Sequence, residues 1–234
     1  GIILAAGEGI RMRSRTPKVL HCLCGKELLR YPVELLRRLG VDRLVVVVSP
    51  ANQGAVAELL GDSVEYAVQS AKTGTAGAVD SASDLLQGKS SQVVVLGSDS
   101  PLISEESVRR LVEENLANGR QMSILSGIVN DGSGLGRIDR GPGSQQSVLG
   151  IVEASDDPDR SGAPVEVNSG VYCFQGDWLW ENLDRVSTGE GTERYLTDLA
   201  AIASNQGNLV AALQAYDPSE VLGINNRVEL ARLE

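Results

Sequence analysis

The chain of 234 residues is predicted to fold as an α/β protein around a mostly parallel sheet. Short apolar runs without polar alternation, such as Leu44–Val48, are typical of strands that are buried on both faces. In the first half, a helix-forming segment follows each of these runs. This alternation indicates parallel strands joined by crossover helices, so we expect helices on both faces of the sheet.

The first half contains the expected elements in a regular order. Pro32 is tolerable in the first turn of a helix, Gly40 is placed to end that helix, and Glu105 with Glu106 occupies the first turn of another. The expected strands are Ile2–Leu4, Leu44–Val48, Val64–Val68 and Val93–Leu96, and the expected helices are Leu28–Leu39, Gln53–Leu60, Thr75–Leu86 and Ser104–Asn118.

The second half is less regular after Gln121. Gly, Ser, Asp and Pro interrupt Asn130–Ser147, which indicates hairpins or an insertion over the sheet edge. No stretch resembles a linker and no repeat is visible, so we expect one domain over residues 1–234. The strands expected here are Val148–Glu153, Val165–Phe174 and Leu209–Gln214, and the helices are Asp177–Leu183, Tyr195–Asn205 and Asn226–Leu233.

Composition excludes several classes of protein. With 21 basic and 31 acidic residues the net charge is −10, which disfavours a non-specific nucleic-acid binder. No apolar run approaches the roughly 18–20 residues of a membrane span. Three cysteines are an odd count that fits a reducing compartment, so we expect a cytoplasmic protein. Cys22 and Cys24 beside His21 lack a second cluster that would complete a structural metal site. Because the chain opens at Gly1 directly on an apolar run, we expect a few residues to precede it.

In an open α/β sheet, ligands bind beyond the carboxyl ends of the strands, so the loops after Leu4, Val68, Leu96 and Phe174 are the places to search. The first of these loops contains Gly7 and Gly9, which let backbone N–H groups approach an anion closely. Four cations follow within eight residues, and together these features predict a polyphosphate site. The four cations are Arg11, Arg13, Arg15 and Lys18.

Two rival phosphate loops do not fit this segment. A dinucleotide-binding loop needs a third glycine where Met12 stands, and a P-loop needs a Gly-Lys-Ser/Thr sequence that does not follow. A surface turn with a solvated basic stretch remains the alternative.

Two further loops carry polar residues after buried strands. Gln69 offers an amide suited to the edge of a nucleobase, Gly74 allows close backbone approach, and Thr75 stands where a helix N-cap is expected. Asp99 follows the strand Val93–Leu96 and is suited to a hard cation. Simple helix capping and an Asp turn are the respective alternatives.

These motifs together resemble a known family. L-A-A-G-x-G-x-R-M from Leu4, P-K-V-L-H from Pro17, G-T-x-x-A from Gly74 and D-x-P-L from Asp99 are similar to the sugar-1-phosphate nucleotidyltransferases. The similarity is greatest to the uridylyltransferase domain of the bacterial N-acetylglucosamine-1-phosphate uridylyltransferases. It continues in collinear order over nearly the whole chain, through Gly134–Ile138, Gly150–Glu153, Glu166–Gly170, Tyr195–Asp198 and Gly223–Arg227.

The resemblance implies a Rossmann-like domain with a nucleotide-binding half at about residues 1–120 and a sugar-binding half at about 121–234. It implies Mg²⁺-dependent transfer of UMP from UTP to N-acetylglucosamine-1-phosphate, which gives pyrophosphate and the UDP-sugar that peptidoglycan synthesis uses. Nucleic acid and membrane are not among the implied partners.

The resemblance also assigns roles to residues at matching positions. Arg11 and Lys18 would be catalytic, and Asp99 and Asn225 would be the Mg²⁺ ligands. The implied nucleotide-binding residues are Leu4, Ala5, Ala6, Gly7, Gly9, Gln69, Gly74 and Thr75, and the implied sugar-phosphate-binding residues are Gly136, Glu153, Asn168, Tyr195 and Thr197.

Some positions depart from the family pattern and bear on selectivity; they are Ile10, Gly77, Gly97, Ser98 and Leu135. Family members usually continue into a left-handed β-helix that transfers acetyl groups and through which they oligomerise. The hexapeptide repeats of that domain are absent from this sequence, so we expect a fragment without acetyl transfer. The competing functions are another sugar-phosphate or cofactor nucleotidyltransferase of the same fold, and a non-catalytic nucleotide-binding module.

Overall fold

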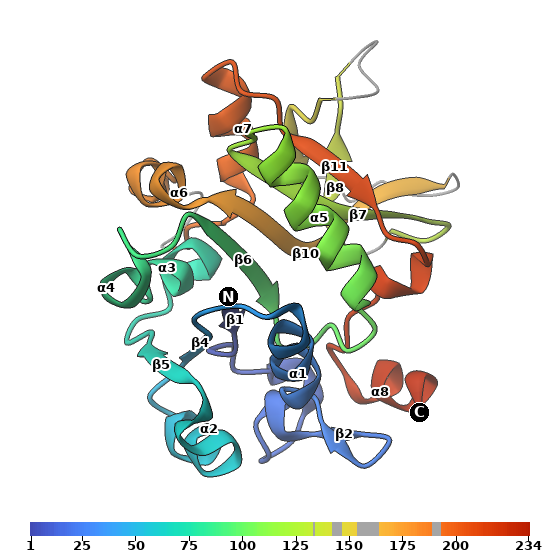
Figure 1. Cartoon of the computed structure of the whole chain (residues 1–234). Coiled ribbons are helices and arrows are strands. Elements are labelled where there is room, and N and C mark those ends of the chain that lie inside the picture. The colour runs from blue at the N-terminus through green and yellow to red at the C-terminus, as the bar shows by residue number, and fades with distance from the viewer. Residues whose placement is uncertain (133, 142–146, 154–163, 189–192) are drawn as a thin grey trace.

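The computed structural model describes residues 1–132, 134–141, 147–153, 164–188 and 193–234. In these residues the central sheet has the strand order β11-β7-β10-β6-β1-β4-β5 (Figure 1). Strands β1 (Ile2–Leu4), β4 (Val45–Val48), β5 (Glu65–Val68) and β6 (Gln92–Gly97) are parallel to one another. The prediction of a mostly parallel sheet is therefore confirmed.

The sheet continues past β6 through strands of the second half. Strand β10 (Val165–Gln175) is antiparallel to both β6 and β7 (Met122–Val129), and β11 (Ala211–Gln214) is parallel to β7. Two short strands, β8 (Arg137–Asp139) and β9 (Gly150–Val152), extend from β10 as the expected strand-rich insertion. Part of the expected irregular stretch 130–147, namely 133 and 142–146, lies outside the described residues.

Each buried strand supplies two apolar cores because successive side chains point to opposite faces. Val45 and Val47 face one core, and Val46 and Val48 face the other. Helices α3 (Gly74–Asp80), α4 (Ser83–Leu86), α6 (Gly176–Leu183) and α7 (Asp198–Asn205) cover the first face. Helices α1 (Arg30–Leu39), α2 (Gln53–Leu60) and α5 (Glu105–Ala117) cover the second.

Two expectations about the elements are wrong, and one strand lies where no element was expected. The helix expected at Thr75–Leu86 is broken into α3 and α4, because Ser81 donates its hydroxyl back to the Gly77 carbonyl and the chain tightens there. The helix expected from Tyr195 begins only at Asp198. Strand β7 was not expected at all, since Ser123, Ser126 and Gly127 interrupt its apolar run.

Short elements outside the sheet complete the described structure. Strands β2 (Cys22–Leu23) and β3 (Lys26–Glu27) form a hairpin, and α8 (Arg227–Leu233) is the last helix. The single-turn helices are η1 (Ile10–Met12), η2 (Lys18–Leu20), η3 (Gly61–Ser63) and η4 (Pro218–Val221). No helix in the described ranges is long and apolar enough to cross a membrane.

A buried carboxylate anchors the C-terminal segment to the first half of the chain. Glu220 is 4 % exposed and accepts hydrogen bonds from the Ser104 N–H, the Ser107 hydroxyl and the Asp217 N–H. Ser104 is also the N-cap of α5, where its side chain accepts from the Ser107 N–H. Glu220 thus fixes the position at which the chain turns back towards Asn225.

Replacing Glu220 with Ala should lower the free energy of unfolding by about 2–4 kcal/mol, because several buried donors lose their shared acceptor. Urea denaturation measures this change. Glu113→Ala, an exposed site on α5, is the matched control and should stay within about 0.5 kcal/mol of the parent. Equal effects of the two substitutions would contradict the anchoring role of Glu220.

Candidate active site

A cleft of about 650 Å³ opens at the carboxyl ends of β1, β5 and β6, a size suited to a small-molecule ligand. The loop after β1 forms much of its wall, and parts of the loops after β5 and β6 complete it. Residues 193 and 225 reach it from the second half of the chain. The lining residues are Leu4, Ala6, Gly7, Glu8, Gly9, Ile10, Arg11, Lys18, Val19, Gln69, Lys72, Gly74, Ser98, Asp99, Glu193 and Asn225.

The glycine loop is folded tightly around Lys18. Gly9 has a φ of 61°, and a Cβ at this position would come within 2.4 Å of the Lys18 Cβ. Only glycine fits this left-handed conformation next to the lysine stem. Met12 is buried beneath the loop, whereas Arg11 stays exposed at the cleft. The loop therefore holds the two predicted catalytic cations over the ends of the strands.

Four residues from three distant parts of the chain meet in this cleft. The Lys18 ammonium donates to Asp99 Oδ2 at 2.5 Å and to Asn225 Oδ1 at 3.1 Å. Arg11 Nη2 donates to the same Asn225 oxygen at 2.9 Å. The Ile224 N–H donates to the Asp99 carbonyl at 2.8 Å, and this bond holds the two predicted metal ligands side by side.

This donor set fits a divalent cation of the Mg²⁺ type. The Asp99 and Asn225 oxygens converge on one ammonium group, so both can address one small cation. Mg²⁺ typically binds one or two protein oxygens and takes its other ligands from phosphates and water. Among the described residues, no cluster of three His, Cys, Asp or Glu side chains could hold a metal ion. The site therefore fits an ion that is bound partly by the protein and partly by its substrate and water.

The predicted base-binding amide is already oriented. Gln69 Nε2 donates to the Gly74 carbonyl at 3.0 Å and to the Thr73 hydroxyl at 3.3 Å. A carbonyl can only accept, so this contact fixes which end of the amide is nitrogen. Both amide hydrogens are used, and Oε1 is the atom of Gln69 that remains to accept a hydrogen bond from a ligand.

Thr75 does not cap a helix, so that expectation is wrong. The N-cap of α3 is Thr73, and the Thr75 hydroxyl instead accepts the Leu196 N–H at 2.8 Å. Arg194 bonds to the same region, with its N–H on the Thr73 carbonyl and its carbonyl on the Ala76 N–H, both at 2.9 Å. We call residues 193–197 the strap, since this segment ties the second half of the chain to the start of α3.

Four of the five predicted sugar residues form a connected set. The Asn168 N–H donates to the Gly136 carbonyl at 2.8 Å, and the Thr197 hydroxyl donates to Glu153 Oε1 at 2.6 Å. The pairing of β8 with β9 joins these two contacts, because Gly136 directly precedes β8 and Glu153 directly follows β9. Tyr195 is 38 % exposed on the strap and donates its hydroxyl to Glu193, which lines the cleft.

Not every predicted residue reaches the cleft. Ala5 is 1 % exposed and packs in the core covered by α1, α2 and α5. Arg13 and Arg15 are exposed and do not line the cleft, which takes only Arg11 and Lys18 from the basic stretch. The loop after Phe174 lies at the opposite edge, because β10 is antiparallel and Phe174 pairs with Val93 at the start of β6.

Sequence reasoning missed three charged residues of the cleft. Glu8 and Lys72 form an ion pair of 2.6 Å that joins the loops after β1 and β5. Both stand inside the two segments that the sequence singles out, so their loops were the available signal. Glu193 arrives on the strap, and no local pattern marks it.

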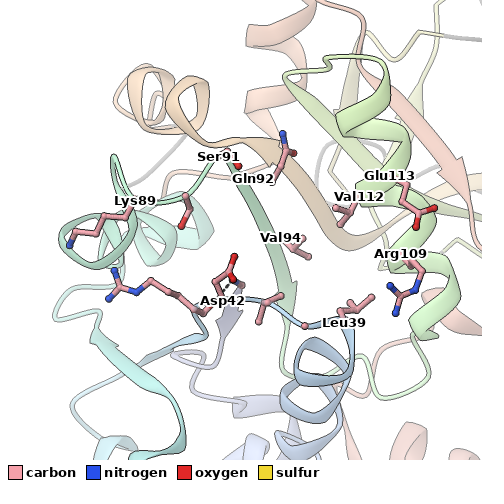
Figure 2. Close-up of a pocket in the computed structure, with 14 residues that line it drawn as sticks. Leu39, Asp42, Lys89, Ser91, Gln92, Val94, Arg109, Val112 and Glu113 are labelled. Atoms are coloured by element: carbon pink, nitrogen blue, oxygen red, sulfur yellow. Dashed lines mark hydrogen bonds between the residues drawn. The ribbon is translucent and has the colours of Figure 1, made fainter.

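Another cavity, of about 360 Å³, lies at the opposite edge of the sheet, between Gly1 at the beginning of β1 and helix α5 (Figure 2). Its cations are already engaged in hydrogen bonds. Arg43 bonds to Glu65, Lys89 donates to the Asp84 carbonyl at 2.7 Å, and Arg109 bonds to Glu105 at 2.6 Å. It lies at the amino ends of the parallel strands, away from the edge where open α/β sheets bind ligands.

The fold and the cleft define an α/β protein with a glycine-rich loop and an oxygen-donor pair at the carboxyl edge of its sheet. Residues 1–217 match the family model of the nucleotidyl transferases, so the chain belongs to the nucleotidyl transferase family. The family resemblance seen in the sequence is confirmed.

Several known proteins are similar to this chain. It is 38 % identical over 234 residues to the bifunctional protein GlmU of Geobacillus sp. (strain WCH70), covering 100 % of this chain and 50 % of that protein. It is 41 % identical to the bifunctional protein GlmU of Streptomyces avermitilis, covering 98 % of this chain and 48 % of that protein. The chain thus spans about half the length of the curated relatives it matches.

A solved structure shows the same fold. It carries the provisional name glucose-1-phosphate thymidylyltransferase, comes from Bacillus anthracis and was solved in complex with a sucrose. It superposes with a TM-score of 0.80 at 19 % identity, over 99 % of this chain and 92 % of that one.

Gly74 should be irreplaceable because the strap lies against it. Its φ is 78°, and a Cβ would meet the Arg194 carbonyl oxygen at 2.4 Å. Gly74→Ala should therefore lower the free energy of unfolding by about 2–4 kcal/mol, as left-handed strain adds to a backbone clash.

Gly88→Ala is the control, since Gly88 has a similar φ of 68° with no atom within 4 Å of the added Cβ. It should cost about 1–2 kcal/mol, the strain alone. Denaturation of both variants without ligand measures the difference. Equal decreases in the free energy of unfolding would show that the strap moves aside without cost and would contradict the prediction.

Proposed function

We propose that this chain transfers UMP from UTP to N-acetylglucosamine-1-phosphate in a Mg²⁺-dependent reaction that releases pyrophosphate. The observation that carries the proposal is the convergence of Arg11, Lys18, Asp99 and Asn225 beside the glycine loop. Full-length relatives of about twice this length are named bifunctional, and we propose that this chain corresponds to their nucleotidyl-transferring part.

The reaction joins two anions, so positioning and charge neutralisation supply most of the rate. An oxygen of the sugar phosphate forms a bond to the α-phosphorus of UTP, the bond from that phosphorus to the bridging oxygen breaks, and the electron pair leaves on pyrophosphate. The sugar phosphate is already ionised at neutral pH, so no general base is needed. Bound Mg²⁺ supplies positive charge and orients the phosphate oxygens.

The charges that line the cleft explain why a cation is needed there. Its cations are Arg11, Lys18 and Lys72, and its acids are Glu8, Asp99 and Glu193, so the formal sum is zero. A triphosphate needs additional positive charge in such a cleft. Asp99 and Asn225 would hold the metal, and the Lys18 ammonium together with Arg11 would stabilise the departing pyrophosphate.

Base choice rests on Gln69 in this proposal. Its Oε1 accepts the N3–H of uracil, while the backbone near Gly7 and Gly74 meets the remaining edge of the base. A cytosine presents an acceptor at N3, and two acceptors facing each other are unfavourable.

In this proposal the sugar is recognised by residues of the second half of the chain. Gly136, Glu153, Asn168 and Thr197 lie on or beside β8, β9, β10 and α7, and they present hydroxyl, amide and carboxylate groups suited to a hexose. Glu153 would meet sugar hydroxyls rather than the phosphate, because two anions repel.

The competing function is a nucleotidyl transfer of the same class that uses another nucleotide or another acceptor. Gly77 is buried in α3, and the Thr73 side chain takes the space that a side chain at position 77 would need. The Thr73 hydroxyl accepts a hydrogen bond from Gln69 Nε2, so glycine at position 77 bears on the surroundings of the base-binding amide. A competition assay with UTP, dTTP, CTP and GTP against N-acetylglucosamine-1-phosphate and glucose-1-phosphate separates the candidates. A non-catalytic module would release no pyrophosphate in any of these mixtures.

Asp99→Asn should reduce turnover of UTP and N-acetylglucosamine-1-phosphate at least about 100-fold, because a metal ligand loses its charge while its shape is kept. Release of pyrophosphate with and without Mg²⁺ measures this. Asp62→Asn, at an exposed site in η3, is the control and should keep parental turnover. Parental activity of Asp99→Asn would remove Asp99 from the site.

Glu153→Gln should raise the KM for N-acetylglucosamine-1-phosphate about tenfold, since a charge-assisted hydrogen bond to a sugar hydroxyl becomes a neutral one. The Kd of UTP, measured by calorimetry without sugar, should stay within about twofold. Loss of UTP binding instead would contradict the placement of Glu153 on the sugar side.

A further inference from the structure

Strand β10 is distorted at the point where it carries a predicted sugar residue. Its pairing with β7 shifts register between Asn168 and Tyr172, and Gly170 between them has a φ of 77°. The Ser169 hydroxyl donates to the Leu125 carbonyl at 2.7 Å and accepts the Val171 N–H at 3.2 Å, which stabilises the bulge. Bulges next to functional sites re-aim side chains.

The bulge brings two side chains together that a regular strand would keep apart. Residues four apart in a strand are separated by about 13 Å along its axis. Here Asn168 Nδ2 donates to the Tyr172 hydroxyl oxygen at 2.7 Å. The contact therefore depends on the bulge and does not follow from strand geometry.

The orientation of the Asn168 amide is fixed by its two partners. The Gly170 N–H donates to Asn168 Oδ1 at 3.0 Å, and a backbone N–H can only donate, so the nitrogen faces Tyr172. One amide hydrogen and one lone pair remain for a ligand. These are the two groups with which the half-buried Asn168 can bind a sugar phosphate.

Tyr172 is itself held rigidly and stays protonated. It is 5 % exposed in the core beneath α3, α6 and α7, with its ring centroid 5.8 Å from that of Phe174. Burial raises the pKa of its hydroxyl far above the ordinary value and outweighs the Asn168 hydrogen bond, which lowers it. The Glu153 carboxylate raises this pKa further, so a second predicted sugar residue lies within electrostatic range of the same hydroxyl.

We propose that Tyr172 is a positioning residue of the sugar-phosphate subsite, whose buried hydroxyl holds the Asn168 amide in its binding orientation across the β10 bulge. The proposal rests on the proposed function, because it gives Asn168 a sugar phosphate to bind. It adds a residue that does not itself touch the substrate.

Tyr172→Phe tests the proposal, since it removes the hydroxyl and keeps the ring. The KM for N-acetylglucosamine-1-phosphate should rise about 3- to 10-fold, the effect expected from one lost hydrogen bond. The Kd of UTP without sugar should stay within about twofold. Tyr66→Phe is the control, because Tyr66 donates its hydroxyl to the Gly61 carbonyl at 2.6 Å on β5, the strand at the other end of the sheet from β10 and its neighbours. It should leave the KM unchanged, and a purely structural Tyr172 would lower the Tm of the protein and also leave the KM unchanged.

The Asn168→Ala background shows whether Tyr172 acts through Asn168. In that background, Tyr172→Phe should raise the KM for the sugar phosphate by less than about twofold further. A full additional 3- to 10-fold rise would overturn the proposal, because Tyr172 would then act by another route.

The side-chain amide signals of Asn168 give a readout that needs no substrate. They are assigned by their loss in Asn168→Ala. The signal of the amide hydrogen that is bonded to Tyr172 should exchange slowly with solvent in the parent and at least about tenfold faster in Tyr172→Phe. Unchanged exchange would overturn the proposal. Absence of turnover by the parent protein would instead overturn the proposed function, while the amide measurement would still decide whether Tyr172 holds Asn168.

Discussion

The contact of Lys18 with Asp99 and Asn225 is the interaction on which the arrangement of this protein depends. It joins the loop after β1, the loop after β6 and the segment before α8 at a single ammonium group. Two acceptors placed this close, one of them a carboxylate, are stable together only with a cation between them. The Lys18 ammonium satisfies this requirement in the structure, and a metal would satisfy it in the proposed reaction.

Three further contacts between distant parts of the chain make that contact possible. The pairing of β6 with β10 attaches the second half of the sheet to the first. The strap lies against Gly74 and bonds to Thr75, which fixes Glu193 and Thr197 at the same time. Glu220 bonds to the start of α5 and directs the chain towards Asn225. Each of these contacts spans more than 70 residues of sequence, so the site forms only when both halves have folded together.

Hydrogen bonds also hold the predicted sugar-binding side chains in place. Glycines, a bulge and a buried hydroxyl set the direction of Asn168, and hydrogen bonds between side chains link Glu153 to Thr197. Groups that are already hydrogen-bonded in the free protein lose little freedom when a ligand binds. This pre-organisation explains why residues without direct ligand contact, Tyr172 among them, are placed so closely behind the proposed site.

The sequence by itself determined the parallel core and the loops that face the ligand. Continuous runs of apolar residues indicate buried strands. A loop that follows a parallel strand lies at the ligand-binding edge of the sheet. The positions of Gly7, Gln69 and Asp99 after such strands therefore predicted that they line the cleft. The family motifs then added Asn225 and the sugar-binding residues. Their roles remain predictions, although the structure places most of them in two connected sets.

Only the tertiary structure decided what depends on partners distant in sequence. Strand β7 contains serines whose polarity hides it from pattern analysis, yet the Ser123 hydroxyl finds a buried acceptor in Asn115 at 2.6 Å. The Thr75 hydroxyl accepts the Leu196 N–H of the strap and does not cap its own helix. The antiparallel direction of β10 places the loop after Phe174 at the edge of the sheet opposite the cleft. Hydrophobic periodicity records which face of an element is buried, but it carries no information on which distant segment covers that face or accepts its hydrogen bonds.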